Sequence, residues 1–172
     1  WFGKITPQRA PATNMNFSLE VDTYDGINRG ASATTSPEAC VNQKSPEVVG
    51  NLGLTHILSP KTFIDLKAAY FWGYYYLDPE VGPDISGHFD GVANMLYDSA
   101  GYFFYADRTR LQVNASFTHF AEDFIQGNHD FKFGVEAERS MVRNRYGYTG
   151  PTHSYYWDYY GPYLRYQYEG YD

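Results

Sequence analysis

Two stretches between Arg108 and Arg139 alternate apolar and polar residues at every second position, and this alternation limits what the chain can fold into. In the first stretch the apolar positions are Leu111, Val113, Ala115 and Phe117. In the second stretch they are Phe131, Phe133, Val135 and Ala137. Because successive side chains of a β-strand point to opposite faces, each stretch predicts a strand with one apolar and one polar face. Such a hairpin belongs either to a soluble sheet packed on a core or to a barrel with lipid outside and water inside.

Composition narrows the classes of protein. Aromatic residues make up 19% of the chain, with 18 Tyr and 12 Phe, although the mean hydropathy is only −0.52. Strand-forming residues interleaved with polar ones give this combination. The net charge of −7 argues against a nucleic-acid partner, because phosphate binding needs a basic face. No stretch approaches the ~20 apolar residues of a membrane helix, a run that barrel strands do not need either.

The same alternation predicts further strands. The stretch at 63–76 places Ile64, Leu66, Ala68, Tyr70, Trp72 and Tyr74 on one face. It exceeds the ~9–11 residues that a tilted strand needs to cross a bilayer, and its aromatic end at 70–76 suits a girdle at the membrane–water boundary. The complete set of predicted strands lies near 15–22, 51–58, 63–76, 106–120, 129–143 and 162–168.

The connections between these strands alternate in length. Short turns follow Leu58 and Phe120, whereas long connections follow Tyr76 and Arg145. Outer-membrane barrels have short periplasmic turns and long extracellular loops. The alternation therefore predicts that the short turns face the periplasm and the long connections face the medium. The predicted fold is therefore all-β, with antiparallel up-and-down strands of a transmembrane β-barrel and long extracellular loops. Six strands are fewer than the ~8 of the smallest closed barrel, so we expect a partial barrel.

The ends of the chain suggest an internal piece of a larger protein or a processed product. The chain begins at Trp1 without an initiator Met or a signal peptide. We expect residues 1–172 to form a single segment of a barrel domain, without a plug domain. Cys40 is the one cysteine, which excludes an internal disulfide and leaves its role open.

Three segments resemble a known family. RLQVNASFTHFAEDFIQGNHDFKFGVEAERS resembles the barrel of TonB-dependent outer-membrane receptors, and in particular the Oar-like branch, whose members carry an N-terminal carboxypeptidase-regulatory-like domain. LTHILSPKTFIDLKAAY is similar to a repeated pattern of those barrels, and PYLRYQYEGY to an aromatic loop; together the segments span about residues 52–168. The resemblance implies a bacterial outer-membrane location, contact with outer-membrane lipid, and uptake of a bulky nutrient or metal chelate. It also implies coupling to a TonB-type energy complex through parts of the receptor not in this chain.

Aromatic residues near the C-terminus are candidate ligand-binding residues. Flat rings with polar tips suit a sugar- or peptide-binding platform in an extracellular loop. The alternative is that they pack within the loop or form the edge of a girdle. The candidates are Tyr155, Tyr156, Trp157, Tyr159 and Tyr160.

Acidic residues after the 63–76 strand are candidate calcium ligands. Ca²⁺ takes ~6–8 oxygen ligands, but their spacing fits no EF-hand loop, and a solvated acidic loop is the alternative. The candidates are Asp78, Glu80, Asp84 and Asp90. On the polar face, Asp65 with Lys67 and Lys132 with Glu136 suggest solvated ion pairs.

The sequence contains no motif of a known catalytic centre. It has no G-x-S-x-G, H-E-x-x-H or P-loop sequence, so we expect neither an enzyme nor a cofactor. His129 and Asp130 are adjacent on a strand and point to opposite faces, which argues against a shared acid–base site.

Two alternative functions stay open. The chain could be a surface or filament subunit that pairs strands between copies, because an incomplete barrel leaves sheet edges unpaired. It could also be a small outer-membrane adhesin barrel, which would need ~8 strands.

Overall fold

The computed structural model describes residues 1–157 and 164–169, which form two compact units. Unit 1 comprises Trp1–Asp22, Glu47–Gly73 and Arg108–Met141, and unit 2 comprises the segments Thr23–Pro46, Tyr74–Asp107 and Val142–Asp172. The predicted all-β fold with an antiparallel sheet is confirmed. The described residues contain one 3₁₀ turn, η1 (Pro37–Ala39), and no helix with the length and hydropathy to cross a membrane.

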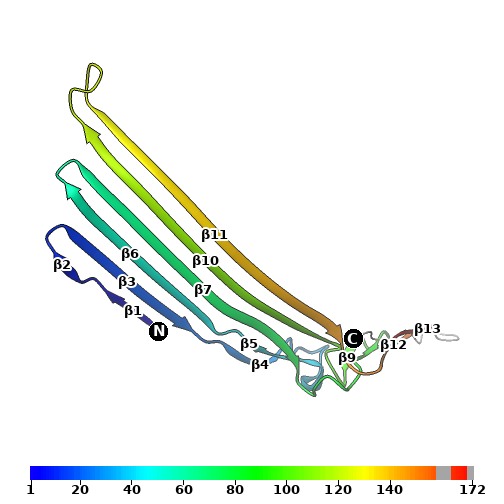
Figure 1. Ribbon diagram of the computed structural model, residues 1–172. Helices are drawn as coiled ribbons and strands as arrows, with labels where there is room; N and C mark the ends of the chain where they lie inside the picture. The colour runs from blue at the N-terminus through cyan, green and yellow to red at the C-terminus, as the bar shows by residue number, and fades with distance from the viewer. Residues whose placement is uncertain (158–163, 170–172) are drawn as a thin grey trace. The chain divides into compact units, whose positions relative to one another are not determined.

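The larger sheet is an up-and-down meander. Its strand order is β1-β3-β6-β7-β10-β11, with β2 also paired to β3 (Figure 1). The bounds are β1 (Phe2–Ile5), β2 (Gln8–Ala10), β3 (Thr13–Asp22), β6 (Glu47–Ser59), β7 (Thr62–Pro79), β10 (Tyr102–Ala121) and β11 (His129–Tyr148). Within the described residues the sheet is open, because β11 has no strand beside it on its outer edge.

Short turns join the strands at one end of the unit 1 sheet. The turns at 11–12, 60–61 and 122–128 all lie at this end (Figure 1). Ser59 pairs with Thr62, so Pro60 and Lys61 alone reverse the chain. Pro60 suits this position because its ring presets the backbone for a turn and it cannot extend a ladder.

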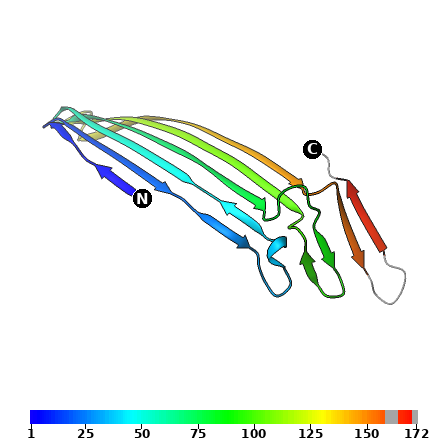
Figure 2. The same cartoon turned by 90° about the horizontal axis from the view of Figure 1, so that it is seen from below.

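Unit 2 carries the shorter strands. β4 (Asp25–Arg29) pairs with β5 (Val41–Lys44), and β5 pairs with the last residues of β7. A second sheet has the order β13-β12-β8-β9, and Figure 2 shows its two hairpins, β8 with β9 and β12 with β13. Its bounds are β8 (His88–Asp90), β9 (Met95–Tyr97), β12 (Thr152–Trp157) and β13 (Leu164–Glu169).

Every buried side chain of the core belongs to unit 2. The buried apolar residues are Ala39, Cys40, Val41, Ala100 and Ala106. Two buried hydroxyls, those of Ser99 and Thr149, lie 3.2 Å apart in a hydrogen bond. In unit 1 the buried positions are the glycines Gly53 and Gly73, so the described part of this unit has no side-chain core.

Each of the six predicted strands has an observed counterpart, with shifted ends. The counterparts are β3, β6, β7, β10, β11 and β13. Within residues 1–49 the sequence predicts a strand only near 15–22, whereas β1, β2, β4 and β5 also lie there. These strands have only 3–5 residues each, too few to show alternation, and their conformation depends on the strands with which they pair. Three long strands, β7, β10 and β11, contribute residues to both units.

Candidate functional site

The unit 1 sheet has an apolar face that lies bare. Phe133 is 64% exposed and Val135 is 74% exposed, although both side chains are wholly apolar. Other exposed apolar residues of the same face are Phe17, Leu52, Leu66, Leu111, Val113 and Phe117. No described element packs these residues into a core, so the apolar face is exposed in the described part of the chain.

Hydrogen-bonded Thr–His pairs border this face near the short turns. The hydroxyl of Thr13 lies 2.8 Å from Nδ1 of His56, and the hydroxyl of Thr62 lies 2.8 Å from Nδ1 of His119. Thr13 and His56 are direct partners in the β3–β6 register. Residues opposite each other share a face, and His56 has the parity of Leu52 and Leu54, so the pair lies on the apolar face of these two strands.

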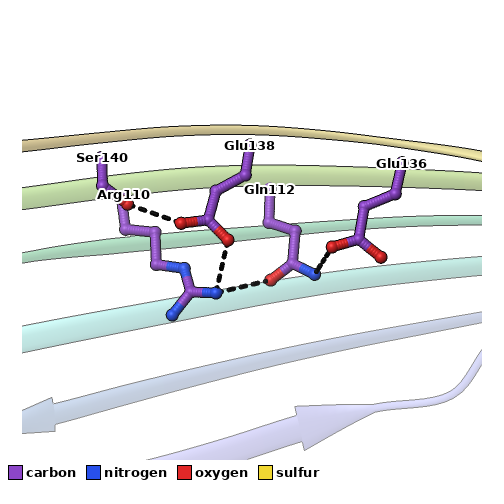
Figure 3. A network of polar contacts seen from close by, with 5 residues as sticks. All are labelled: Arg110, Gln112, Glu136, Glu138 and Ser140. Atoms are coloured by element: carbon purple, nitrogen blue, oxygen red, sulfur yellow. Dashed lines mark hydrogen bonds and ion pairs between the residues drawn. The ribbon is translucent and has the colours of Figure 1, made fainter.

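The opposite face of unit 1 is polar and internally hydrogen-bonded. Arg110 forms a 2.6 Å ion pair with Glu138 across β10 and β11, and Gln112 donates to Glu136 at 3.1 Å (Figure 3). Ser140 donates to Glu138 at 2.7 Å, so the carboxylate has partners on two sides. The side chains of Arg110 and Glu138 are 53% and 36% exposed, which keeps the pair in contact with water.

A polar hollow lies beside this network. Its volume is about 480 Å³, and its polar lining residues are Asp65, Lys67, Asn114, Ser116, Lys132 and Glu136. The ion pairs expected for Asp65 with Lys67 and for Lys132 with Glu136 are absent from the described residues, because Asp65 instead accepts from Thr55 at 2.6 Å and Glu136 accepts from Gln112. The hollow therefore presents two lysines and several polar groups to its interior.

In unit 2, two tyrosine–aspartate pairs form a cluster. Tyr76 donates to Asp107 and Tyr105 donates to Asp78, each at 2.6 Å. The two rings meet edge to face with centroids 4.8 Å apart, and the guanidinium of Arg145 lies 5.0 Å from the Tyr105 ring centroid. Burial, followed by the hydrogen bond to Asp78, raises the pKa of Tyr105 to about 12. Its hydroxyl therefore remains a donor at any physiological pH.

The aromatic ligand candidates are only partly described. The structure gives the backbone of Tyr155, Tyr156 and Trp157 on β12, where Tyr155 pairs with Phe89 of β8. Tyr159 and Tyr160 lie outside the described residues. The sequence-based prediction of a binding platform therefore stays a prediction.

The acidic candidates are not gathered into a metal site. Asp78 accepts from Tyr105, Glu80 is hydrogen-bonded to Asn42, and Asp90 accepts the backbone N–H groups of Val92 and Ala93 at 2.8 and 2.9 Å. Among the described residues no group of three or more acidic, His or Cys side chains could hold a metal ion. Asp78, Glu80 and Asp90 thus have separate structural partners, and Asp84 is exposed.

Cys40 is a buried structural residue of unit 2. It is 1% exposed, and its thiol donates to the carbonyl of Ser36 at 3.3 Å. Burial, with the negative charges of Glu38 and Glu80, raises the pKa of the Cys40 thiol. A neutral, enclosed thiol is a poor nucleophile.

The Thr–His and Tyr–Asp pairs and the Arg110–Glu138 ion pair were missed from the sequence. Alternation predicts which residues share a face, but these contacts depend on which residue of one strand lies opposite which residue of the next. The turn between β10 and β11 spans residues 122–128 and is too long to fix the register of the two strands by itself. The connection between β7 and β10 is longer still, so neither the ion pair nor the Tyr–Asp pairs had a signal in the sequence.

No protein-family model, curated protein or solved structure matches this chain. The functional inference therefore depends on the fold and on the two faces of the unit 1 sheet.

Proposed function

We propose that this chain forms part of the wall of an outer-membrane β-barrel, in a TonB-dependent receptor that imports a bulky nutrient or metal chelate. The observation that carries the proposal is the bare apolar face of unit 1. In water, exposed apolar patches larger than a few hundred Å² are rare on monomers. Contact with lipid would remove the free-energy cost of exposing the apolar face to water, and the polar face would then border an aqueous interior.

The length of the apolar face supports a bilayer as its partner. On β10, Thr109 and His119 border Leu111, Val113, Ala115 and Phe117. On β11, His129 and Arg139 border Phe131, Phe133, Val135 and Ala137. Both intervals are about ten residues, or ~34 Å of antiparallel strand. At a tilt of ~40° this spans ~26 Å, which agrees with the ~25 Å apolar band of outer-membrane barrels.

The polar face and the connections fit the same proposal. Arg110, Gln112, Glu136 and Glu138 would line the lumen, where charged side chains stay hydrated. The regions 77–105 and 144–172 would face the medium and help to capture the ligand. Energy coupling would depend on parts of the receptor other than these strands.

Spin labels along β10 test the proposal directly. Single cysteines at 109–119, in a Cys40→Ser background and reconstituted in vesicles, would each carry a nitroxide. We expect odd positions to collide with oxygen dissolved in lipid and even positions to collide with an aqueous nickel chelate. Odd positions shielded from both reagents would mean a dry protein core and would overturn the lipid assignment.

A filament or surface subunit is the second candidate, because β11 is the last strand of the larger sheet and no described strand lies along its outer edge. Such an edge pairs readily with another chain. Extraction separates the two functions: a barrel wall requires detergent, whereas a filament is released in aqueous buffer and sediments as a polymer.

A further inference from the structure

Cationic side chains collect on one face of unit 2 near the end of β11. Arg143 and Arg145 share a face of that strand and are both exposed. The Arg145 guanidinium lies over the ring of Tyr105. Lys44 is the register partner of Tyr76, whose ring contacts Tyr105. Because directly opposite residues share a face, Lys44 belongs to the same side as these rings.

The arginines of this face have unused hydrogen-bond donors. Within the described residues neither Arg143 nor Arg145 forms an ion pair or hydrogen bond. The nearby carboxylates of Asp78 and Asp107 already accept tyrosine hydroxyls. A guanidinium presents five N–H donors in a planar fork that matches a phosphate. The face therefore combines available phosphate donors with aromatic rings.

The position of these residues along β11 indicates which phosphate they meet. Arg143 and Arg145 have the same parity as Phe131, Phe133, Val135 and Ala137, so they continue the apolar face of the strand. Residues of this parity are apolar from Phe131 to Ala137, and beyond them three of the next four are arginines: Arg139, Arg143 and Arg145, with Met141 as the exception. In a bilayer, the level just beyond the hydrocarbon is the headgroup level, where phosphates are concentrated.

We propose that Lys44, Arg143 and Arg145, beside Tyr76 and Tyr105, bind the phosphate of anionic lipid headgroups on the long-connection side of the membrane. This proposal depends on the proposed function, because it requires the apolar face to contact lipid. It adds a lipid-selective site to a chain whose net charge of −7 would otherwise repel anionic lipid.

The test compares lipid selectivity of two charge-matched variants in reconstituted vesicles. Arg143→Gln/Arg145→Gln removes two charges from this face, and Arg108→Gln/Lys132→Gln removes two exposed charges of the opposite parity. Spin-labelled phosphatidylglycerol and phosphatidylcholine report the relative association of each lipid with the protein. We expect the natural chain to prefer phosphatidylglycerol about fivefold or more, because one basic residue near an anionic membrane surface contributes ~1 kcal/mol, a factor of about five. The preference should vanish in the first variant, persist in the second, and weaken in high salt.

Each other result rejects the proposal in a distinct way. Equal selectivity in both variants would show that general charge, not this face, attracts the lipid. Loss of selectivity on adding inorganic phosphate, but not sodium chloride of equal ionic strength, would assign the site to free phosphate. A chain that floats with vesicles but has no preference would overturn this inference alone. Failure of the natural chain to insert would overturn the proposed function as well.

Discussion

The two units differ in which side chains they bury. Unit 2 encloses Ala39, Cys40, Val41, Ala100 and Ala106, whereas unit 1 encloses only glycines among its described residues. Yet the long strands of unit 1 place many apolar residues on one face. A sheet one layer thick has nothing of its own to cover either face. Unit 2 therefore has a side-chain core of its own, whereas the described part of unit 1 has none.

The largest expected effect comes from a charge placed on the bare apolar face. Val113→Arg should destabilise the chain in vesicles by ~2–4 kcal/mol, because lipid-facing arginine near the bilayer midplane costs about that much. Asn114→Arg on the opposite face is the control and should be nearly neutral. Urea unfolding in vesicles measures both variants, and equal costs would show that the two faces meet the same environment.

Replacing an alanine by leucine should change the stability of the two units in different ways. Ala106 in unit 2 is fully buried, so Ala106→Leu should overpack the core and cost ~1–3 kcal/mol. Ala137 in unit 1 is exposed on the apolar face, so Ala137→Leu should be neutral or stabilising in vesicles. Thermal unfolding of both variants checks the contrast, and a comparable cost at Ala137 would mean that a protein surface covers it.

A smaller effect is expected at the tyrosine–aspartate cluster. Tyr105→Phe removes the hydrogen bond to Asp78 and should cost ~1.5 kcal/mol at neutral pH, since the acceptor is charged. The pKa of Tyr105 is raised to about 12, above the ordinary value of ~10. The stability gained from its protonated form is therefore fully present below pH ~10 and lost as pH rises toward 12. Unfolding at pH 7 and pH 11 should show the gap between the two proteins shrinking; a constant gap would contradict this.

The smallest effect is expected for the polar face of unit 1. A double-mutant cycle with Arg110→Gln and Glu138→Gln should give a coupling energy of ~0.5 kcal/mol, because both side chains are partly exposed. Arg110→Gln combined with Asp130→Asn provides an unpaired control that should be additive. Coupling well above 1 kcal/mol would indicate that water is excluded from this face.

The long strands were predictable from the sequence because each carries its own alternation. The stretch at 63–76 places six residues, from Ile64 to Tyr74, on one face, and it is observed within β7. The short strands were not predictable in this way. Phe2–Ile5 has four residues and is a strand because it pairs with Leu19 and its neighbours in β3. Its conformation is a property of the pair, which no single-strand pattern contains.

The polar residues were harder to interpret than the apolar ones. Asp78 belongs to an acidic stretch that suggested a solvated loop or calcium, but in the fold it ends β7 beside Tyr105. Tyr105 is 27 residues away along the chain, so only tertiary structure brings the pair together. Apolar faces follow from local periodicity, whereas polar contacts depend on long-range register.

The Thr–His pairs have a consequence for how the strands find their partners. A one-residue slip of β6 along β3 would turn Leu52 and Leu54 to the polar side, so the hydrophobic pattern alone rejects it. A two-residue slip keeps every side chain on its proper side, and that pattern cannot detect it. It would, however, place Thr13 opposite Leu54 or Leu58 and leave His56 without its partner. Thr13–His56 and Thr62–His119 thus distinguish the correct alignment from its nearest competitor, at the end of the sheet where the short turns form.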